Sequence, residues 1–311
     1  MSVQPGAPAA SAPPDITRAV PAPLLAVDAP SLMYRAFFAL PDSIKDAEGR
    51  PANALLGTAN LVLWVVERHA PRAVVMCFGA EAAHYRTEIF PPYHADRPEM
   101  PEGLATQWAD APALFEDFGW TVLVHETLEA DDLLGTLAAL ETEAGGRTLL
   151  FTGDRDMFQC ASDTVTILFP RGGAQRDGPE EIGPEEVRER YGIEPHQVPC
   201  FIALRGDPSD GLPGAKGIGE KTARDLLRRY GTLEGVLAAA AKPGTLTPRQ
   251  SAALLDAQEE LRGFREIATL QTVEGLERPP DRPTDFARAA EGARRHGLNR
   301  LAERLEKLAA G

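Results

Sequence analysis

Acidic side chains at two neighbouring element ends, between residues 129 and 156, constrain this chain more than any other feature. Leucines between residues 133 and 140 recur at helical spacing, so the acids before them occupy the first turn of a predicted helix, where the helix dipole favours negative charge. Residues 148–151 form a β-rich run, and the Gly-Asp step after it predicts a strand ending in a turn. The acids are Glu129, Asp131, Asp132, Asp154 and Asp156.

These carboxylates have two explanations. Taken alone, the first group is explained by a helix start, where the helix dipole favours negative charge, and the second by a turn that an aspartate side chain stabilises through a hydrogen bond. Crowded together at one sheet edge, however, the carboxylates would repel one another and need a compensating cation or raised pKa values. Mg²⁺ and Mn²⁺ prefer oxygen ligands, and two such ions can hold the attacking and leaving oxygens of a phosphodiester displacement. The two groups together therefore favour a metal site.

The fold class follows from an alternation of strand and helix patterns. Residues 24–28, 73–78, 120–124, 148–151 and 164–169 are predicted strands, with helices such as 31–40 and 53–69 between them. This alternation predicts an α/β fold with a mostly parallel sheet covered on both faces. Asp28 ends the first strand, Glu129 follows the third and Asp154 follows the fourth, so we expect them to meet at one edge, where α/β sheets bind ligands. The second strand ends in Gly79, where the pattern invites an acid and supplies none.

Composition fits a globular chain with room for two domains. Its 311 residues are 43% hydrophobic, which allows a sizeable core, and no apolar run approaches the ~20 residues of a membrane span. Residues 1–23, rich in Ala and Pro, lack the basic start and apolar core of a signal peptide and are predicted to be a disordered tail. The net charge of −14 argues against a protein that coats nucleic acid but allows local binding.

The cysteines and histidines offer no metal or nucleophile motif of their own. Cys77, Cys160 and Cys200 lie far apart, and three free thiols fit a reducing compartment, so the cytoplasm is the expected location. The six histidines are scattered as well, which disfavours a zinc site and a Cys-His nucleophile pair.

From residue 184 the pattern changes to successive helices, which predicts a second, smaller domain. The predicted helices are 184–191, 197–205, 220–230, 233–241, 248–261, 284–295 and 298–308. The expected division is a tail at 1–23, an α/β domain at 24–183, a helical domain at 184–278 and C-terminal helices at 279–311 that pack on the body.

A glycine-rich hairpin joins two of these helices and follows a loop that carries Asp207 and Asp210. Its glycines allow close approach of another backbone, and it exposes N–H groups at a helix N-terminus, which bind anions. Such contacts touch phosphate and not base, so binding would be sequence-independent. No predicted strand precedes the glycines, which disfavours a dinucleotide fold. The candidate DNA-binding residues here are Gly214, Lys216, Gly217, Gly219, Lys221 and Thr222.

The polar stretch between residues 79 and 120 interleaves aromatic and cationic side chains. This composition suits stacking and backbone contacts with a nucleic acid strand, and a solvated connection is the alternative. The candidates are Tyr85, Arg86, Tyr93, His94 and Arg97.

Taken together, these motifs resemble the 5′-3′ exonuclease domain of bacterial DNA polymerase I, within the wider flap endonuclease family, from about residue 24 to 308. The resemblance rests on Val27-Asp28, Tyr34-Arg35-Ala36-Phe37-Phe38, Tyr93 with Arg97-Pro98, Glu129 to Asp132, Thr152 to Asp156 and Gly206 to Asp210. It implies a PIN-like nuclease domain, a smaller helix-hairpin-helix domain, and two-ion hydrolysis of DNA at 5′ ends or flaps, in replication or repair. With no polymerase portion following, a stand-alone member is expected, in functional partnership with a separate DNA polymerase.

The resemblance also implies roles for individual residues. Arg86 and Arg97 match positions that contact the scissile phosphate region, and the turn from Gly214 to Gly219 matches one that holds a monovalent cation such as K⁺ through backbone carbonyls. The implied metal ligands are Asp28, Glu129, Asp131 and Asp132 for the first ion, and Asp154, Asp156 and Asp210, with Asp207 nearby, for the second.

Three departures from the family pattern touch the chemistry. Gly79 stands where the family usually has Asp, which implies one weakened metal site, and His94 stands where it usually has Lys. Ala29-Pro30 replaces Gly-Asn beside Asp28. They motivate an alternative function, a DNA-structure-binding protein with weakened catalysis, in which Gly79→Asp with His94→Lys should recover activity. An RNA-cleaving relative on the same scaffold is a third hypothesis, disfavoured by the hairpin domain.

Overall fold

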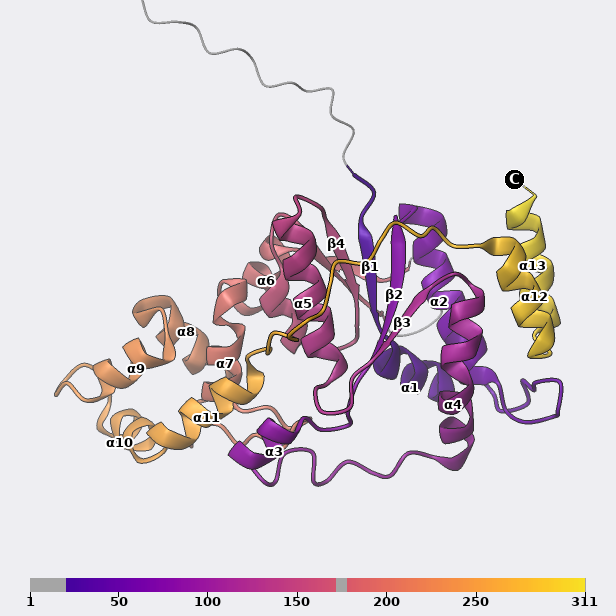
Figure 1. The fold of residues 1–311 in the computed structure, drawn as a ribbon. Helices are drawn as coiled ribbons and strands as arrows, with labels where there is room; N and C mark the ends of the chain where they lie inside the picture. The colour runs from indigo at the N-terminus through magenta and orange to yellow at the C-terminus, as the bar shows by residue number, and fades with distance from the viewer. Residues whose placement is uncertain (1–20, 172–177, 311) are drawn as a thin grey trace, which may run out of the picture.

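The computed structural model describes residues 21–171 and 178–310. Most of the predicted tail at 1–23 lies outside the described residues. Within them, a central sheet is covered by helices on both faces, and a group of helices from the second half of the chain extends to one side (Figure 1).

The sheet has six strands in the order β3-β2-β1-β4-β5-β6. The first five pair in parallel, and β6 pairs antiparallel with β5. The predicted strands are found within one residue of their expected bounds, whereas β6 was not predicted, because three residues are too few for a pattern. The strands are β1 Leu24–Asp28, β2 Ala73–Phe78, β3 Thr121–Val124, β4 Thr148–Phe151, β5 Val165–Phe169 and β6 Glu180–Ile182.

Alternate strand residues face two separate cores. On one face, Leu25 and Val27 pack with α1 (Ala29–Ala39), α2 (Asn53–His69), α4 (Glu102–Asp117), α12 (Phe286–Arg295) and α13 (Asn299–Ala309). On the other, Leu24 and Ala26 pack with α5 (Ala130–Glu143) and the helical domain. Every residue of β1 is buried, as expected for a central strand of a parallel sheet.

The helical domain differs from the prediction at one point. The helix expected at 248–261 is two helices, which meet at Ala257, where the backbone leaves helical geometry with φ −100° and ψ 9°. Leu254 is buried before this break, while Leu261, Phe264 and Ile267 are buried after it on a helix that contacts α7. The helices are α6 Pro184–Tyr191, α7 Val198–Arg205, α8 Glu220–Tyr230, α9 Leu233–Ala240, α10 Pro248–Asp256 and α11 Gln258–Ala268.

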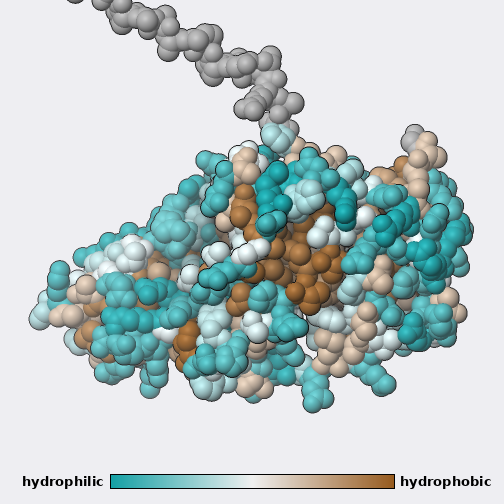
Figure 2. Space-filling model, in the orientation of Figure 1, coloured by the Kyte–Doolittle hydropathy of each residue, from teal (hydrophilic) through white to brown (hydrophobic). Residues whose placement is uncertain are grey.

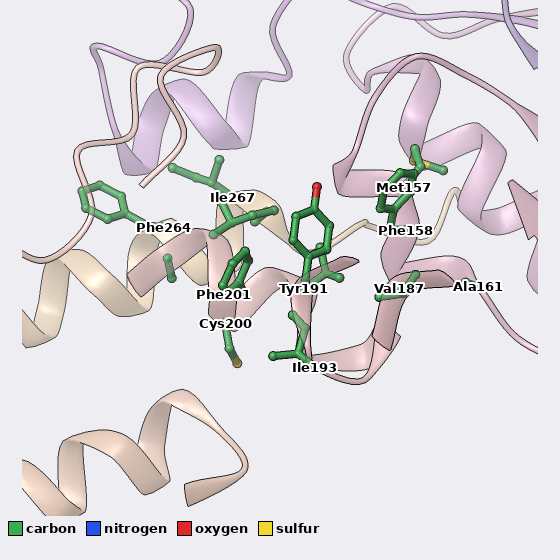
Figure 3. Close-up of a cluster of buried hydrophobic side chains, with 14 of the residues drawn as sticks. Met157, Phe158, Ala161, Val187, Tyr191, Ile193, Cys200, Phe201, Phe264 and Ile267 are labelled. Carbon is green, nitrogen blue, oxygen red and sulfur yellow. The ribbon is translucent and has the colours of Figure 1, made fainter. Parts of the chain in front are cut away.

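A shared core fixes the helical domain to the sheet (Figure 3). The short 3-10 helix η1 (Asp156–Cys160) begins at the second of the two acids that follow β4. It places Phe158 6.1 Å from Tyr191, ring centre to ring centre. Tyr191 in turn lies 5.4 Å from Phe201 on α7. Because dense apolar packing resists deformation, the glycine hairpin after α7 is held in a set position relative to those acids.

Apolar surface gathers between α5 and the edge strand β3 on the face drawn in Figure 2. Val124, at the end of β3, is 67% exposed. Among the described residues, no helix combines the length and the apolar composition needed to cross a membrane.

Candidate active site

The strand order places a topological switch point between β1 and β4, and the predicted acids gather there. The chain leaves β1 toward one side of the sheet and β4 toward the other, which opens a crevice at their carboxyl ends. A cavity of about 970 Å³ lies at this position. Its lining includes seven of the eight predicted acids, namely Asp28, Glu129, Asp131, Asp154, Asp156, Asp207 and Asp210.

Asp28 is fixed by the start of α1 and by the end of β4. Its carboxylate accepts hydrogen bonds from the backbone N–H of Ser31 at 3.0 Å and from the hydroxyl of Thr152 at 2.7 Å. Burial nevertheless raises the pKa of Asp28, in spite of these two bonds. Pro30 sits in the first turn of α1, where no N–H is needed, so the Ala29-Pro30 departure leaves this cap intact.

Three acids of the cavity have almost no protein partner. No described residue donates a hydrogen bond to the carboxylates of Asp131 or Asp156, and Asp154 accepts one, from the N–H of Asp156 at 2.8 Å. Burial, with the charge of Asp154 next, raises the pKa of Asp131 and of Asp156 well above the usual value. Burial and the charges of nearby acids raise the pKa of Asp154 to about 6. All three residues are half-buried. Carboxylates that are partly removed from water and have few donors are the groups that a cation would stabilise.

The donor set fits a hard divalent cation, since it is made of carboxylate oxygens. In the part of the chain that the structure describes, however, no three His, Cys, Asp or Glu side chains are grouped closely enough to hold an ion between them as they stand. The structure thus brings Asp28, Asp131 and Asp154 to one cavity, but their carboxylates are not close enough together to bind one ion as they stand. Coordination would require their side chains to rotate toward a common point.

Arg86 does not face open solvent, as a phosphate-contacting residue would. It is 3% exposed, and its guanidinium lies 2.8 Å from Glu129 and 3.1 Å from Asp132. It also donates to the carbonyl of Ile267 at 3.0 Å. These two acids raise the pKa of Arg86 in spite of its burial. Arg86 therefore ties α5 to α11, although it also lines the cavity.

Asp132 is the predicted ligand that the structure does not bring to the cavity. It is fully buried, and it accepts hydrogen bonds from Arg86 and from the N–H of Gln271 at 2.8 Å. Its second oxygen accepts the N–H of Glu129 at 3.2 Å, which caps α5. Asp132 is thus occupied by the protein itself.

Gly79 is closed off by the start of α5. A Cβ atom at this position would lie 2.3 Å from the backbone N of Ala130 and 2.4 Å from the carbonyl carbon of Glu129. Real Cβ atoms do not approach backbone atoms so closely. An acid at position 79 would therefore clash with the backbone at the start of α5.

The loop after α7 holds its two acids in different ways. Asp207 accepts from the N–H of Ser209 at 2.9 Å and from Arg205 at 3.2 Å, so it shapes the loop. Asp210 lies 3.0 Å from the imidazole of His94 and 3.4 Å from the guanidinium of Arg97. Arg97 has an exposed side chain at the cavity rim.

Neither of the two tyrosines predicted to stack on nucleic acid is fully exposed, since Tyr93 is buried and Tyr85 is half-buried. Tyr93 is 5% exposed and donates its hydroxyl to Glu129 at 3.2 Å. The Tyr85 hydroxyl is buried without a partner among the described residues, and Arg86 covers its ring at 5.1 Å. The exposed aromatic ring of the cavity is Phe38, at 71%.

The glycine hairpin keeps its apolar residues inside and its polar ones outside. Leu212, Ala215 and Ile218 are buried. The other candidate residues are exposed or half-buried, namely Gly214, Lys216, Gly217, Gly219, Lys221 and Thr222. Gly214 has φ +65°, and a Cβ there would lie 2.3 Å from the N of Gly206, so only glycine fits. Gly219 begins α8 without a side-chain cap, which leaves its first N–H groups free for an anion.

Comparison with known proteins decides the family. A family model described as the N-terminal resolvase-like domain of 5′-3′ exonuclease matches residues 23–192, and one described as its C-terminal SAM fold matches residues 193–285. The chain belongs to the 5′-3′ exonuclease family. The resemblance seen in its motifs is confirmed.

Relatives of two lengths share this similarity. A 5′-3′ exonuclease of Streptomyces coelicolor is 35% identical over 299 residues, which cover 90% of this chain and 97% of that protein. One from Mycobacterium tuberculosis is 33% identical, with 92% and 97% covered. DNA polymerase I of Mycobacterium bovis is 37% identical over 83% of this chain, and the match spans 29% of that longer protein.

Solved structures share the fold. The T5 D15 protein co-crystallised with metal ions has a TM-score of 0.66 at 16% identity, with 92% of this chain and 99% of that chain covered. The catalytic core of Rad2 in complex with a DNA substrate has a TM-score of 0.62 at 15% identity, with 93% and 91% covered. The predicted fold class, a mostly parallel sheet flanked by helices with a helical hairpin domain, is confirmed.

Several residues at the site of this exonuclease-family chain were not predicted. Thr152 was visible in the Thr-Gly-Asp motif, but nothing in the sequence showed that its hydroxyl, at the end of β4, reaches Asp28 at the end of the adjacent strand β1. Arg205, beside Gly206-Asp207, lines the cavity and pairs with Asp207. Arg155, between two acids of the same motif, lies at the rim. A basic residue next to a predicted ligand was the available signal for both.

Proposed function

We propose that this chain is a divalent-metal-dependent 5′-3′ exonuclease and 5′-flap endonuclease that hydrolyses DNA phosphodiester bonds in DNA replication or repair. The observation that carries the proposal is a group of half-buried carboxylates at the switch point of the sheet, Asp131, Asp154 and Asp156, which accept at most one hydrogen bond each from the described residues. Family membership and the glycine hairpin beside the cavity support it.

We assign the acids to two ions, Mg²⁺ or Mn²⁺. Asp28, Asp131 and Glu129 would hold the first, and Asp154, Asp156 and Asp210 the second, while Asp132 and Asp207 shape the surrounding backbone. When bound, the ions would supply Lewis-acid stabilisation of the charge that develops on the phosphate oxygens. The T5 relatives crystallised with divalent metal ions, including zinc, support metal binding in this fold.

The chain's own residues divide the remaining work. Arg97, exposed at the rim, is free to turn from Asp210 toward a phosphate oxygen and to neutralise it. Arg86 stays inside, where it holds Glu129 in place. Thr152 and Ser31 orient Asp28 through the hydrogen bonds that they donate.

The hairpin would hold the DNA duplex by its backbone. The free N–H groups at the start of α8, with Lys216 and Lys221 exposed beside them, suit phosphate and carry no base information. We include a monovalent cation, K⁺, at the Gly214 to Gly219 turn. The Rad2 core in complex with DNA supports duplex binding by this fold.

A flap assay tests the proposal. The purified protein is incubated with a labelled 5′-flap DNA duplex and with Mg²⁺ or Mn²⁺, beside the Asp154→Ala, Asp156→Ala variant and beside an RNA flap. We expect DNA cleavage that the double variant loses by at least about 10²-fold, comparable to removal of a main electrostatic group. Equal product from the wild type and the variant defeats the proposal, and faster RNA cleavage favours the RNA-cleaving relative.

A second candidate is a DNA-structure-binding protein with weakened catalysis. It is favoured by the absence of a closed ligand group among the described residues and by Gly79. It predicts tight flap binding without turnover in the same assay.

We further propose a partnership with a separate DNA polymerase and a cytoplasmic location. The relationship to DNA polymerase I supports the first. Three free cysteines, of which Cys77 and Cys200 are buried, fit a reducing compartment and support the second.

A further inference from the structure

We infer that His94 is a positioning residue that fixes Asp210 at the edge of the cavity, and not a cation that contacts the phosphate. This inference rests on the proposed nuclease function, because Asp210 is assigned there to the second ion. It departs from the sequence prediction, in which His94 is a candidate DNA-binding residue that stands where the family usually has a lysine.

Both ring nitrogens of His94 are already engaged. Nδ1 lies 2.9 Å from the carbonyl oxygen of Glu81, and Nε2 lies 3.0 Å from a carboxylate oxygen of Asp210. A carbonyl oxygen only accepts hydrogen bonds, so Nδ1 carries a proton and donates it there. The ring is therefore held at one end by backbone, and its other end is aimed at Asp210.

The backbone of His94 reinforces this orientation. Its φ is +57°, in the left-handed region that few residues other than glycine adopt, and its N–H points to the carbonyl of Asp210 at 3.4 Å. The ring stacks on Tyr93 with centroids 3.8 Å apart and planes 21° apart. Because Tyr93 donates its hydroxyl to Glu129, these two adjacent residues hold one acid of each assigned ion group.

Exposure separates His94 from Arg97. The His94 side chain is 4% exposed, so it cannot leave Asp210 for a phosphate in the cavity without breaking its packing, whereas the Arg97 side chain is 42% exposed. Both side chains contact the same carboxylate of Asp210. A lysine at position 94 would have a single terminal nitrogen at the end of a flexible stem and could not clamp Asp210 from a fixed ring.

Two amide variants separate positioning from folding. His94→Gln places an amide near the former Nε2 and can contact Asp210 by donating to it, whereas His94→Asn places its amide near Nδ1 and keeps the bond to Glu81. Asn also tolerates positive φ better than Gln does. If His94 has a purely structural role, His94→Asn should therefore disturb the protein less than His94→Gln. If His94 positions Asp210, His94→Gln should disturb Mn²⁺ binding less than His94→Asn.

The test is calorimetric titration of Mn²⁺ into the metal-free, DNA-free protein, with binding to a 5′-flap DNA measured separately. We expect His94→Asn to weaken one of the two Mn²⁺ sites by about 10-fold or more, as loss of a residue that orients a ligand does. We expect His94→Gln to stay within a few-fold of the wild type, and flap affinity to be unchanged in both. In an Asp210→Asn background, His94→Asn should have no further effect on Mn²⁺ binding.

Two results overturn this inference and leave the proposed function standing. They are an unchanged Mn²⁺ affinity in His94→Asn, and an effect of His94→Asn that persists in the Asp210→Asn background. A loss of flap affinity with intact Mn²⁺ binding overturns it as well, because it would make His94 a phosphate contact. If His94→Asn fails to fold, a His94→Gln variant whose Mn²⁺ affinity falls by 10-fold or more overturns it equally. A wild-type protein that binds no Mn²⁺ overturns the proposed function and this inference with it.

Discussion

Carboxylates at the two ends of the sheet have opposite surroundings, and α5 carries one at each end, the buried Glu141 and the half-buried Asp131. At the amino end of the strands, Glu141 has a side chain 1% exposed and accepts hydrogen bonds from Arg72 and Arg278. Burial alone would raise the pKa of Glu141, but these two arginines hold it below its usual value. At the carboxyl end, Asp131 has no donor among the described residues, and burial with the charge of Asp154 raises its pKa.

This difference shows which end serves stability and which serves chemistry. A buried charge whose hydrogen-bond partners are all present holds the surrounding segments in one arrangement. Here Arg72 also donates a hydrogen bond of 2.8 Å to the carbonyl of Pro279, which ties that segment to the sheet. Buried carboxylates left facing one another cost stability in the free protein and are retained where a ligand offsets the cost. The carboxyl end of the sheet thus has the features of a ligand-binding site.

The largest expected effect is at the stabilising end. Arg72→Met should lower the free energy of unfolding by about 3 kcal/mol, because Glu141 stays buried with one partner fewer. Urea unfolding measures it. The double variant Arg72→Met, Glu141→Met removes both charges and should recover most of the loss. A single variant that unfolds like the wild type would show that this ion network adds no stability.

A smaller effect is expected at Gly79. Gly79→Asp should lower the free energy of unfolding by about 2 kcal/mol, because its Cβ meets the backbone of Glu129 and Ala130. Cleavage of the flap substrate should fall and not rise, and Gly79→Ala is the control that adds the Cβ without the charge. Increased cleavage by Gly79→Asp would instead support the weakened-nuclease alternative and its missing ligand.

The smallest effect is a pH dependence of opposite sign at the two ends. The pKa of Glu141 is lower in the folded than in the unfolded protein, so its contribution to stability is lost as the pH falls below its unfolded value near 4.5. The pKa of Asp154 is raised from 3.8 to about 6, so in the metal-free protein its contribution is lost as the pH rises through that range.

Unfolding free energies of Glu141→Gln and Asp154→Asn, each subtracted from the wild type between pH 3 and pH 7 in EDTA, measure this contrast (~pH range from the pKa values above). The Glu141 difference should grow with pH, and the Asp154 difference should shrink. Two differences of the same slope would contradict the comparison.

Much of the fold could be predicted because the strands are continuous apolar runs and the longer helices have regular periodicity. Asn53–His69 and Glu220–Tyr230 have the predicted bounds. Strand β6 was missed because three residues carry no alternation. The break at Ala257 was missed because residues 248–261 contain no glycine or internal proline to mark it, and the change of buried face there depends on α7.

The positions of the acids could be predicted, but their partners could not. Acids after parallel strands meet at one edge of a sheet, and Asp28, Glu129 and Asp154, expected there because each follows a strand, do line one cavity. Asp131 and Asp132 are adjacent in the sequence, yet one lines the cavity and the other is bound by Arg86 and Gln271. Those partners lie 46 and 139 residues away, and only the tertiary structure brings them there.

Thermal unfolding of Asp131→Asn beside the wild type, first in EDTA and then in Mn²⁺, tests most directly whether the carboxylate cluster is built for a cation. In EDTA the variant should melt higher, by about 2 °C, because one of the repelling charges is gone. In Mn²⁺ the order should reverse, because the wild type gains about 2.7 kcal/mol at a concentration 100 times its dissociation constant and the variant gains much less. A variant that melts lower in EDTA, or a wild type that Mn²⁺ does not stabilise, would contradict it.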